Sequence, residues 1–124
     1  MDRNTNQRRA ICRVLEEHGG PLGPSEIYAA AKHQAPGLGI ATVYRTIRRL
    51  LDENYLATVE LPGEAPRYEL AGKDHHHHFR CRECHRVYDV NGCSDVFRSL
   101  LPKGFHLDGH ELFLFGLCET CNVD

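Results

Sequence analysis

The 124-residue chain has no tryptophan and only five phenylalanines and five tyrosines. A single large aromatic core is therefore not expected. Two small domains sharing so short a chain would each need another source of stability, such as a metal or a partner subunit. No apolar run is long enough to span a bilayer, and the opening Met1-Asp2-Arg3 is not the start of a secretory signal. We therefore expect a cytoplasmic protein with no membrane partner.

A strong net charge is also missing. The chain has 15 basic and 17 acidic side chains, a net charge of −2, which taken alone does not point to nucleic acid. The basic residues are nevertheless clustered in two groups that contain no acidic residue. The groups are Arg3, Arg8, Arg9 and Arg13, followed by Arg45, Arg48 and Arg49. On charge alone, each group fits a solvated helix face as well as a nucleic-acid contact.

The first half of the chain has the pattern of a winged helix-turn-helix. Apolar spacing predicts helices over about 7–18, from Pro24 to before Pro36, and over 42–54, and residues 55–61 and 67–70 favour two strands. In such a domain the third helix enters the major groove. Its exposed face has side chains that can contact bases or phosphates, namely Thr42, Tyr44, Arg45, Arg48 and Arg49. We predict a DNA-binding domain over residues 1–72.

The second half, residues 73–124, is expected to form a small α/β dimerisation domain, which makes the whole chain α+β. Its patterns predict strands over 76–82, 86–90, 105–107 and 111–117 and a helix over 94–101. The apolar run Leu112 to Leu117 favours either a strand buried on both faces or a strand that pairs across a dimer interface.

Two Cys-x-x-Cys pairs bracket this second half, Cys81/Cys84 and Cys118/Cys121. In a chain without a secretory signal, such cysteines favour metal binding over disulfides. Four thiolates in two knuckles are typical of a closed, tetrahedral, structural zinc site. Because the two knuckles are distant in sequence, zinc would tie the end of the chain to the start of the second half. A redox switch through the same thiols is the alternative.

Four consecutive histidines, residues 75–78, come just before the first knuckle. On a strand, side chains alternate between faces, so His75 and His77 would point one way and His76 and His78 the other. One strand could then supply two metal sites. Imidazole binds zinc, iron, nickel and copper, so ligand type does not choose the metal. Further donors near in sequence or later in the chain are Glu69, Asp74, Asp89, Asp95 and His110. The alternative is a polar surface.

Together these motifs resemble the ferric uptake regulator family of bacterial metal-dependent repressors, over essentially the whole chain. The marks are Ala41-Thr42-Val43-Tyr44-Arg45, Arg67-Tyr68-Glu69-Leu70, the histidine run followed by Cys81-x-x-Cys84, and Cys118-x-x-Cys121. The resemblance implies a homodimeric transcription regulator of metal homeostasis. It would bind a palindromic DNA operator when a regulatory metal is present, and it would not be an enzyme.

The resemblance also implies the metal ligands and the base-contacting residues. A regulatory site at the junction of the two domains would use Glu69, His76, His78 and Asp89. A second site within the dimerisation domain would use His75, His77, Asp95 and His110, with Cys93 as an additional candidate. Tyr44 and Arg45 correspond to the base-proximal pair. The implied metals are a structural Zn²⁺ and a regulatory divalent ion, either Zn²⁺, Fe²⁺ or Mn²⁺.

Three departures from the family pattern bear on the metal and on DNA binding. Pro21 occupies the position where many relatives have a histidine ligand, which argues against the iron- or peroxide-sensing type of site. Cys93 is an extra thiol beside Asp95, either a small buried residue or a soft ligand that favours zinc. The chain begins late relative to the family, so a helix that often adds a DNA contact is not expected.

We therefore expect zinc as the regulatory metal, with an iron-responsive or peroxide-sensing repressor as the alternative. A small zinc enzyme is a distant alternative. The sequence contains neither of the motifs that would support it, His-x-Glu…Pro-Cys-x-x-Cys and His-Glu-x-x-His. A metal-storage or redox module without DNA would leave the arginines of the third helix unexplained.

Overall fold

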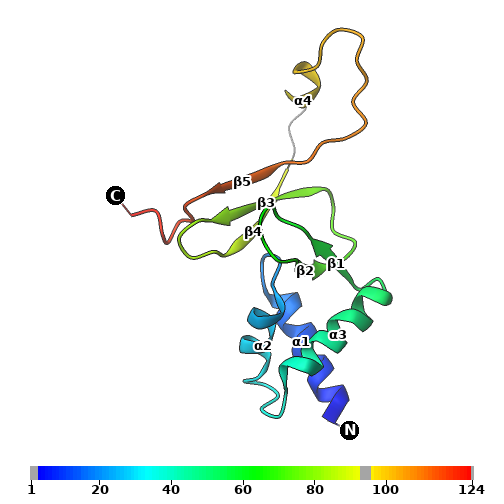
Figure 1. The fold of residues 1–124 in the computed structure, drawn as a ribbon, viewed down its shortest axis with the longest axis vertical. Helices are drawn as coiled ribbons and strands as arrows, with labels where there is room; N and C mark the ends of the chain where they lie inside the picture. Colours follow the sequence, from blue (N-terminus) through cyan, green and yellow to red (C-terminus); the bar gives the residue numbers. More distant parts are fainter. Residues whose placement is uncertain (1–2, 93–95, 124) are drawn as a thin grey trace. The chain divides into compact units, whose positions relative to one another are not determined.

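The computed structural model describes residues 3–92 and 96–123, and the chain divides into two compact units, residues 1–72 and 73–124 (Figure 1). Within these described residues, the first unit has three helices and a two-stranded sheet, and the second has a three-stranded sheet and one short helix. The elements of the first unit are α1 (Arg3–Glu17), α2 (Pro24–Ala31), α3 (Ile40–Asp52), β1 (Leu56–Val59) and β2 (Arg67–Leu70). Those of the second are β3 (His76–Cys81), β4 (Val87–Asn91), α4 (Val96–Ser99) and β5 (Phe113–Gly116). The chain is thus of the mixed α+β class that its sequence predicts.

The first helix begins earlier than its apolar pattern predicts. α1 starts at Arg3, four positions before the predicted start at residue 7. Gln7, Ala10 and Ile11 are buried, so the first turns of α1 pack into the unit. Extending an existing helix costs little compared with nucleating one, and this explains why polar residues continue the helix towards its N-terminus.

The second and third helices begin and end as their local chemistry favours. Pro24 opens α2, and the Glu26 carboxylate accepts a hydrogen bond of 3.0 Å from the Gly23 N–H, which would otherwise lack a helical partner. α3 buries Val43, Ile47 and Leu50 on one face. It ends before Asn54, whose φ of 60° is the left-handed conformation that closes many helices.

One apolar core holds the first unit together. It contains residues from all three helices, from the loops between them and from β1, and its fully buried members include Ile11, Ile27, Val43 and Leu50. The loop between α1 and α2 is fixed to β2 by a pair of backbone hydrogen bonds between Leu22 and Tyr68, of 2.9 and 2.8 Å. The antiparallel pair β1–β2 is therefore part of this unit's framework.

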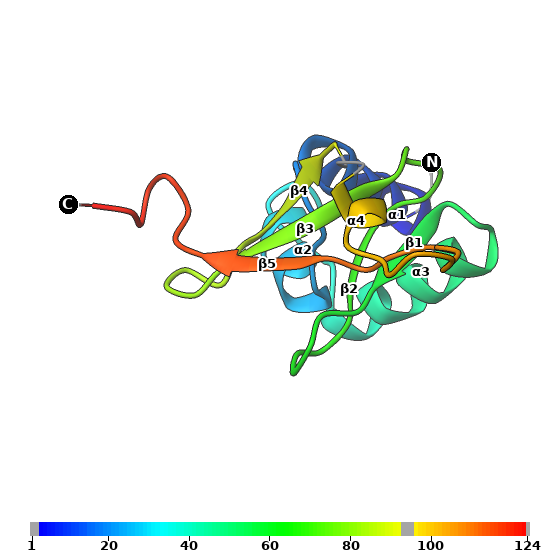
Figure 2. The same ribbon diagram turned by 90° about the horizontal axis from the view of Figure 1, so that it is seen from above.

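The sheet of the second unit has the strand order β4-β3-β5 (Figure 2). β3 pairs with β4 in antiparallel fashion, and the register places His78 opposite Asp89. β5 pairs in parallel with the other side of β3, so that residues from near the end of the chain lie beside the histidine run. The sheet therefore gathers ligand-bearing segments that are distant in sequence.

One expectation for this unit is wrong, and another, which left two alternatives open, keeps only one of them. Residues 105–107 form no strand: they lie in an irregular segment that contains Pro102 and Gly104, and the latter has a φ of 90°. Proline and a left-handed glycine interrupt the extended backbone that a strand needs. β5 is also not buried on both faces, because Phe113 is half-buried while Phe115 is 71% exposed. Among the described residues, β5 pairs with β3 alone and is an edge strand of the sheet.

The expected helix over 94–101 is represented by α4, and residues 93–95 lie outside the described part of the chain. Among the described residues, no helix combines the length and the apolar character needed to cross a membrane.

Candidate metal centres and nucleic-acid interface

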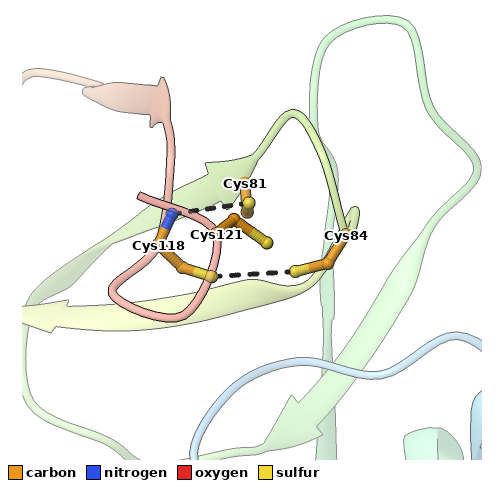
Figure 3. Close-up of side chains that lie close together, drawn as sticks. All are labelled: Cys81, Cys84, Cys118 and Cys121. Carbon is orange, nitrogen blue, oxygen red and sulfur yellow. Dashed lines mark hydrogen bonds between the residues drawn. The ribbon is translucent and has the colours of Figure 1, made fainter. Parts of the chain in front are cut away.

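The four cysteines of the two knuckles converge on one point in the second unit. Cys81 ends β3 and Cys84 follows in the next turn, whereas Cys118 and Cys121 come after β5 (Figure 3). Their sulfur atoms all lie within 4.8 Å of one another, and the sulfurs of Cys84 and Cys118 are 3.9 Å apart. Tetrahedral thiolates around zinc, with Zn–S bonds of about 2.3 Å, would lie about 3.8 Å apart. We refer to these residues as the four-cysteine cluster.

The surroundings of the four-cysteine cluster favour negative charge on its buried sulfurs. Hydrogen bonding from the Cys84 backbone N–H lowers the pKa of Cys81 to about 6. The pKa of Cys118 is lowered by the Cys121 backbone N–H and then by the Tyr88 hydroxyl. Hydrogen bonding with Cys118 and Cys81 raises the pKa of Cys121 to about 12. The cluster therefore holds some thiolates readily but needs a cation to ionise all four, as a structural zinc site does.

A second group of donors lies on one face of the β3–β4 pair. Asp89 Oδ1 is 3.4 Å from His78 Nε2 and 3.8 Å from His76 Nε2. The two imidazoles meet edge to face with their centroids 4.8 Å apart. We call His76, His78 and Asp89 the carboxylate–histidine cluster. Its members come together because His76 and His78 share a strand face and the register sets Asp89 across from it.

In the carboxylate–histidine cluster, a ring nitrogen of His76 and a carboxylate oxygen of Asp89 face each other as two hydrogen-bond acceptors. Nδ1 of His76 lies 2.8 Å from the backbone carbonyl of Asp74, which can only accept, so Nδ1 carries the hydrogen. In the neutral ring, Nε2 is then an acceptor that faces the Asp89 carboxylate. Asp89 Oδ1 is itself buried and accepts no hydrogen bond from the residues that the structure describes. Facing acceptors of this kind fit a divalent cation, and the carbonyl bond orients the ring as second-shell partners of metal sites do.

Two further residues bear on this cluster. Lys73 Nζ lies 2.5 Å from Oδ2 of Asp89, the oxygen that does not face the imidazoles. Glu69, which the family resemblance assigns to the same site, is a residue of β2 in the first unit, where it pairs with Ala57. The lysine is a feature that the motif analysis did not single out.

A third group, His75, His77 and His110, lies on the opposite face of β3. We call it the three-histidine cluster. One ring nitrogen from each lies within 4.8 Å of the others, and Nε2 of His77 is 3.2 Å from Nε2 of His110. Phe97 stacks on His110 with a centroid separation of 4.5 Å. The pKa of His77 is lowered by burial and then by its histidine neighbours, which favours the neutral imidazole that metals bind. Cys93 and Asp95, also candidates here, lie outside the described residues.

Sequence reasoning missed three residues that contact these clusters, namely Lys73, Tyr88 and Phe97. Tyr88 is next to Asp89 on β4, and strand alternation places its side chain on the other face. The alternation of side chains along the predicted strand could therefore have placed Tyr88 on the face opposite Asp89. Nothing local indicates that Phe97 meets His110 or that Lys73 meets Asp89, because each contact depends on how the chain folds back.

The candidate nucleic-acid contacts lie on the exposed side of α3. Tyr44 is 55% exposed, and Arg45, Arg48 and Arg49 are also exposed. Arg45 Nη2 donates a 2.9 Å hydrogen bond to Thr42 Oγ1, one turn earlier. The opposite side of the helix is anchored in the core of the first unit, so this face is held on a rigid support.

Comparison with known proteins agrees with these features. The model of the ferric uptake regulator family matches residues 2–115. The ferric uptake regulation protein of Campylobacter jejuni is 33% identical over 123 residues, which cover 95% of this chain and 78% of that protein.

Solved structures point the same way. A zinc-bound manganese uptake regulator superposes with a TM-score of 0.78 at 28% identity, covering 90% of this chain and 87% of its own. FurB of M. tuberculosis, a zinc uptake regulator, superposes with a TM-score of 0.53 at 26% identity, covering 96% and 95% of the two chains. With its cysteine and histidine clusters in place, the chain belongs to the ferric uptake regulator family of metal-responsive transcriptional regulators.

Proposed function

We propose that this chain is a zinc-responsive, homodimeric transcriptional repressor that binds a palindromic operator. Residues 1–72 would form its winged-helix DNA-binding domain, and residues 73–124 its dimerisation domain. One observation carries the proposal. A cluster of two imidazoles and a carboxylate, with a buried Oδ1 that accepts no hydrogen bond among the described residues, occurs in the same chain as a helix with a tyrosine and three arginines on its exposed face.

The DNA contact is assigned to α3. Arg45, Arg48 and Arg49 project from the face opposite the buried Val43 and Ile47. Arginine can bond guanine edges in the major groove or bind phosphates, and tyrosine and threonine can contact thymine methyls or the backbone. We assign base contacts to Tyr44 and Arg45, and mainly phosphate contacts to the rest of the face.

Dimerisation is assigned to the second unit. β5 is an edge strand that exposes backbone hydrogen-bonding groups together with Phe115, and an edge of this kind is a template for pairing with another chain. A second copy would cover this apolar edge, with two-fold symmetry that matches the symmetry of a palindromic operator. This assignment keeps the dimer alternative for the apolar run Leu112 to Leu117.

The four-cysteine cluster is assigned to structural zinc, and the carboxylate–histidine cluster with Glu69 to the regulatory ion. A metal held by Glu69 of the first unit and by His76, His78 and Asp89 of the second would restrict the two units to an arrangement suited to DNA. The ion shifts the equilibrium between DNA-competent and other arrangements of the units only by binding the DNA-competent arrangement more tightly. A change from 1:99 to 99:1 needs about 5.5 kcal/mol.

Zinc is supported by two features of the ligand set. Position 21 is Pro21, a fully buried residue without a side-chain donor, so it cannot supply the histidine that many relatives have there. The three-histidine cluster, with His75, His77 and His110, offers the all-imidazole donor set found in many zinc sites. Iron or peroxide sensing is the second candidate, because imidazole and carboxylate also bind ferrous iron.

The test is fluorescence anisotropy of the full-length protein on DNA from upstream of its own gene. Free zinc and, under anaerobic conditions, free ferrous iron are buffered separately. The proposal expects tight binding at low free zinc that is lost when the zinc is chelated. Binding that responds to ferrous iron but not to zinc would replace zinc by iron. Binding that responds to neither would overturn the metal-dependent repressor.

A further inference from the structure

We propose that Lys73 sets the metal affinity of the carboxylate–histidine cluster by acting as a displaceable cation on Asp89. This inference rests on the proposed function. It concerns how readily the cluster takes up its ion, and therefore at which free metal concentration the protein responds.

The contact itself is close and well placed. Lys73 Nζ lies 2.5 Å from Asp89 Oδ2, and the Asp89 side chain is only 13% exposed, whereas that of Lys73 is 30% exposed. The ammonium group thus neutralises a largely buried carboxylate. Bonds between an ammonium and a carboxylate are among the stronger hydrogen bonds in proteins.

The two oxygens of Asp89 have different surroundings. Oδ1 faces Nε2 of His78 at 3.4 Å and Nε2 of His76 at 3.8 Å, while Oδ2 is bonded to Lys73. A divalent ion bound by Oδ1 and the imidazoles would share its carboxylate with the ammonium. Like charges repel strongly at such short range in a site partly shielded from water. Metal binding must then displace Lys73 or proceed against its charge, and both lower the affinity.

Lys73 has the side-chain properties that a reversible contact needs. A lysine has a long flexible stem, and a partly exposed one can extend its ammonium into water. Its charge is compact and strongly hydrated, so release is not heavily penalised. The contact is therefore suited to a reversible exchange between lysine and metal.

An ordinary stabilising ion pair would behave differently. Removing such a pair changes the free energy of unfolding but gives no reason for a metal to bind more tightly. Removing a competitor raises the metal affinity of the cluster. The two readings therefore predict different outcomes for the same variant.

The experiment measures zinc affinity by competition with a chromophoric chelator, using the full chain with its four-cysteine cluster loaded. All proteins carry His110→Ala so that the three-histidine cluster does not enter the titration. Lys73→Met removes the charge and keeps an unbranched side chain, Lys73→Arg retains the charge, and Lys103→Met is the matched control at an exposed lysine of the same unit. Thermal unfolding verifies that each variant is folded.

We expect Lys73→Met to tighten zinc binding about tenfold or more, in the range by which outer-shell partners alter metal sites. Lys73→Arg and Lys103→Met should stay close to the parent protein. In an Asp89→Asn background the effect of Lys73→Met should vanish, because the shared carboxylate is gone. Unchanged or weaker binding by Lys73→Met would overturn the inference, and weaker binding would mean that Lys73 positions Asp89 for the metal.

Failure of the proposed function gives a separate result. If the parent protein binds no zinc beyond the four-cysteine cluster, and Asp89→Asn therefore changes nothing, the regulatory site itself is wrong and this inference falls with it. If Asp89→Asn weakens zinc binding while Lys73→Met has no effect, the regulatory site stands and only the role of Lys73 is overturned.

Discussion

Nε2 of His77 and Nε2 of His110 face each other at 3.2 Å, although 33 positions separate the two residues. At this distance both nitrogens cannot carry a hydrogen, so one ring must present its lone pair to the other. The low pKa of His77, caused first by its burial, keeps that ring neutral. Where both rings present a lone pair, a metal ion can bind the two nitrogens together.

We expect His110→Ala to lower the bound zinc by one equivalent per chain while the four-cysteine cluster keeps its ion. The substitution removes one of three imidazoles, and the other two cannot hold zinc tightly alone. Native mass spectrometry in buffered zinc measures the count. The matched control is His106→Ala, because that side chain is exposed and lies outside the cluster. Equal zinc counts in the two variants would contradict a metal site at this position.

The four-cysteine cluster is expected to hold the second unit in its folded form. Few apolar side chains are buried among the described residues of this unit, Val87 being one, so metal binding has to supply much of its stability. Cys81→Ala should remove the structural zinc and, with it, the fold or the dimer of this unit, since such ions contribute about 10–16 kcal/mol in small zinc domains. Zinc content and circular dichroism measure both effects.

Cys12→Ala is the control for this prediction. Cys12 is a half-buried cysteine of α1, outside the four-cysteine cluster, and burial raises its pKa. Its loss should cost about 1 kcal/mol of the free energy of unfolding and leave the zinc content unchanged. A zinc-replete, folded Cys81→Ala protein that resembles Cys12→Ala would show that the cluster is not structural.

Arg45→Ala should weaken operator binding while leaving the zinc content intact. Loss of a base-contacting arginine costs about 1–3 kcal/mol and relaxes the preference for the matching base. Arg48→Ala should instead weaken binding to all sequences and reduce the salt dependence, as loss of a phosphate contact does. Fluorescence anisotropy measures the affinity for operator and for scrambled DNA at several salt concentrations, and so distinguishes loss of a base contact from loss of a phosphate contact.

Arg98→Ala, on α4 of the second unit, is the control for the same charge change. It should bind the operator as the unmodified protein does. If Arg45→Ala also binds normally at moderate salt, the assignment of α3 as the recognition helix is wrong.

Phe115→Asp should convert the dimer into a folded monomer. Phe115 is 71% exposed on β5, so a charge there costs little within one chain. In a dimer formed through this edge, the charge would be buried without a partner, which is strongly destabilising. Sedimentation velocity measures the assembly state, and Val123→Asp provides a control at a residue 82% exposed near the chain end. A dimeric Phe115→Asp protein would place the interface elsewhere.

The histidine run is a case in which local periodicity correctly predicts which side chains lie together. Side chains of a strand alternate with a period of two, and the structure indeed separates His76 and His78 from His75 and His77. The Cys-x-x-Cys spacings are equally local, because each knuckle brings two sulfurs together within one turn. The fold class, the types of metal ligand and their division into separate clusters could therefore be predicted from the sequence alone.

Predictions that depended on more distant neighbours were less successful. The apolar pattern of 105–107 predicted a strand, but the segment pairs with no strand among the described residues and follows Gly104, which has a left-handed backbone. The run containing Phe115 predicted either burial on both faces or pairing across a dimer interface, and the exposed Phe115 on an edge strand contradicts only the first alternative. Apolar character alone does not say whether a strand is covered by its own chain or is left open at an edge.

The sequence by itself thus determines which metal-ligating side chains are present and how they alternate along each strand. The register between β3 and β4 places Asp89 opposite His78, and the return of the chain brings His110 to His77 and Lys73 to Asp89. These contacts join residues between 11 and 33 positions apart. Their geometry follows from strand pairing, packing and the path of the loops, which act over distances that no local spacing encodes.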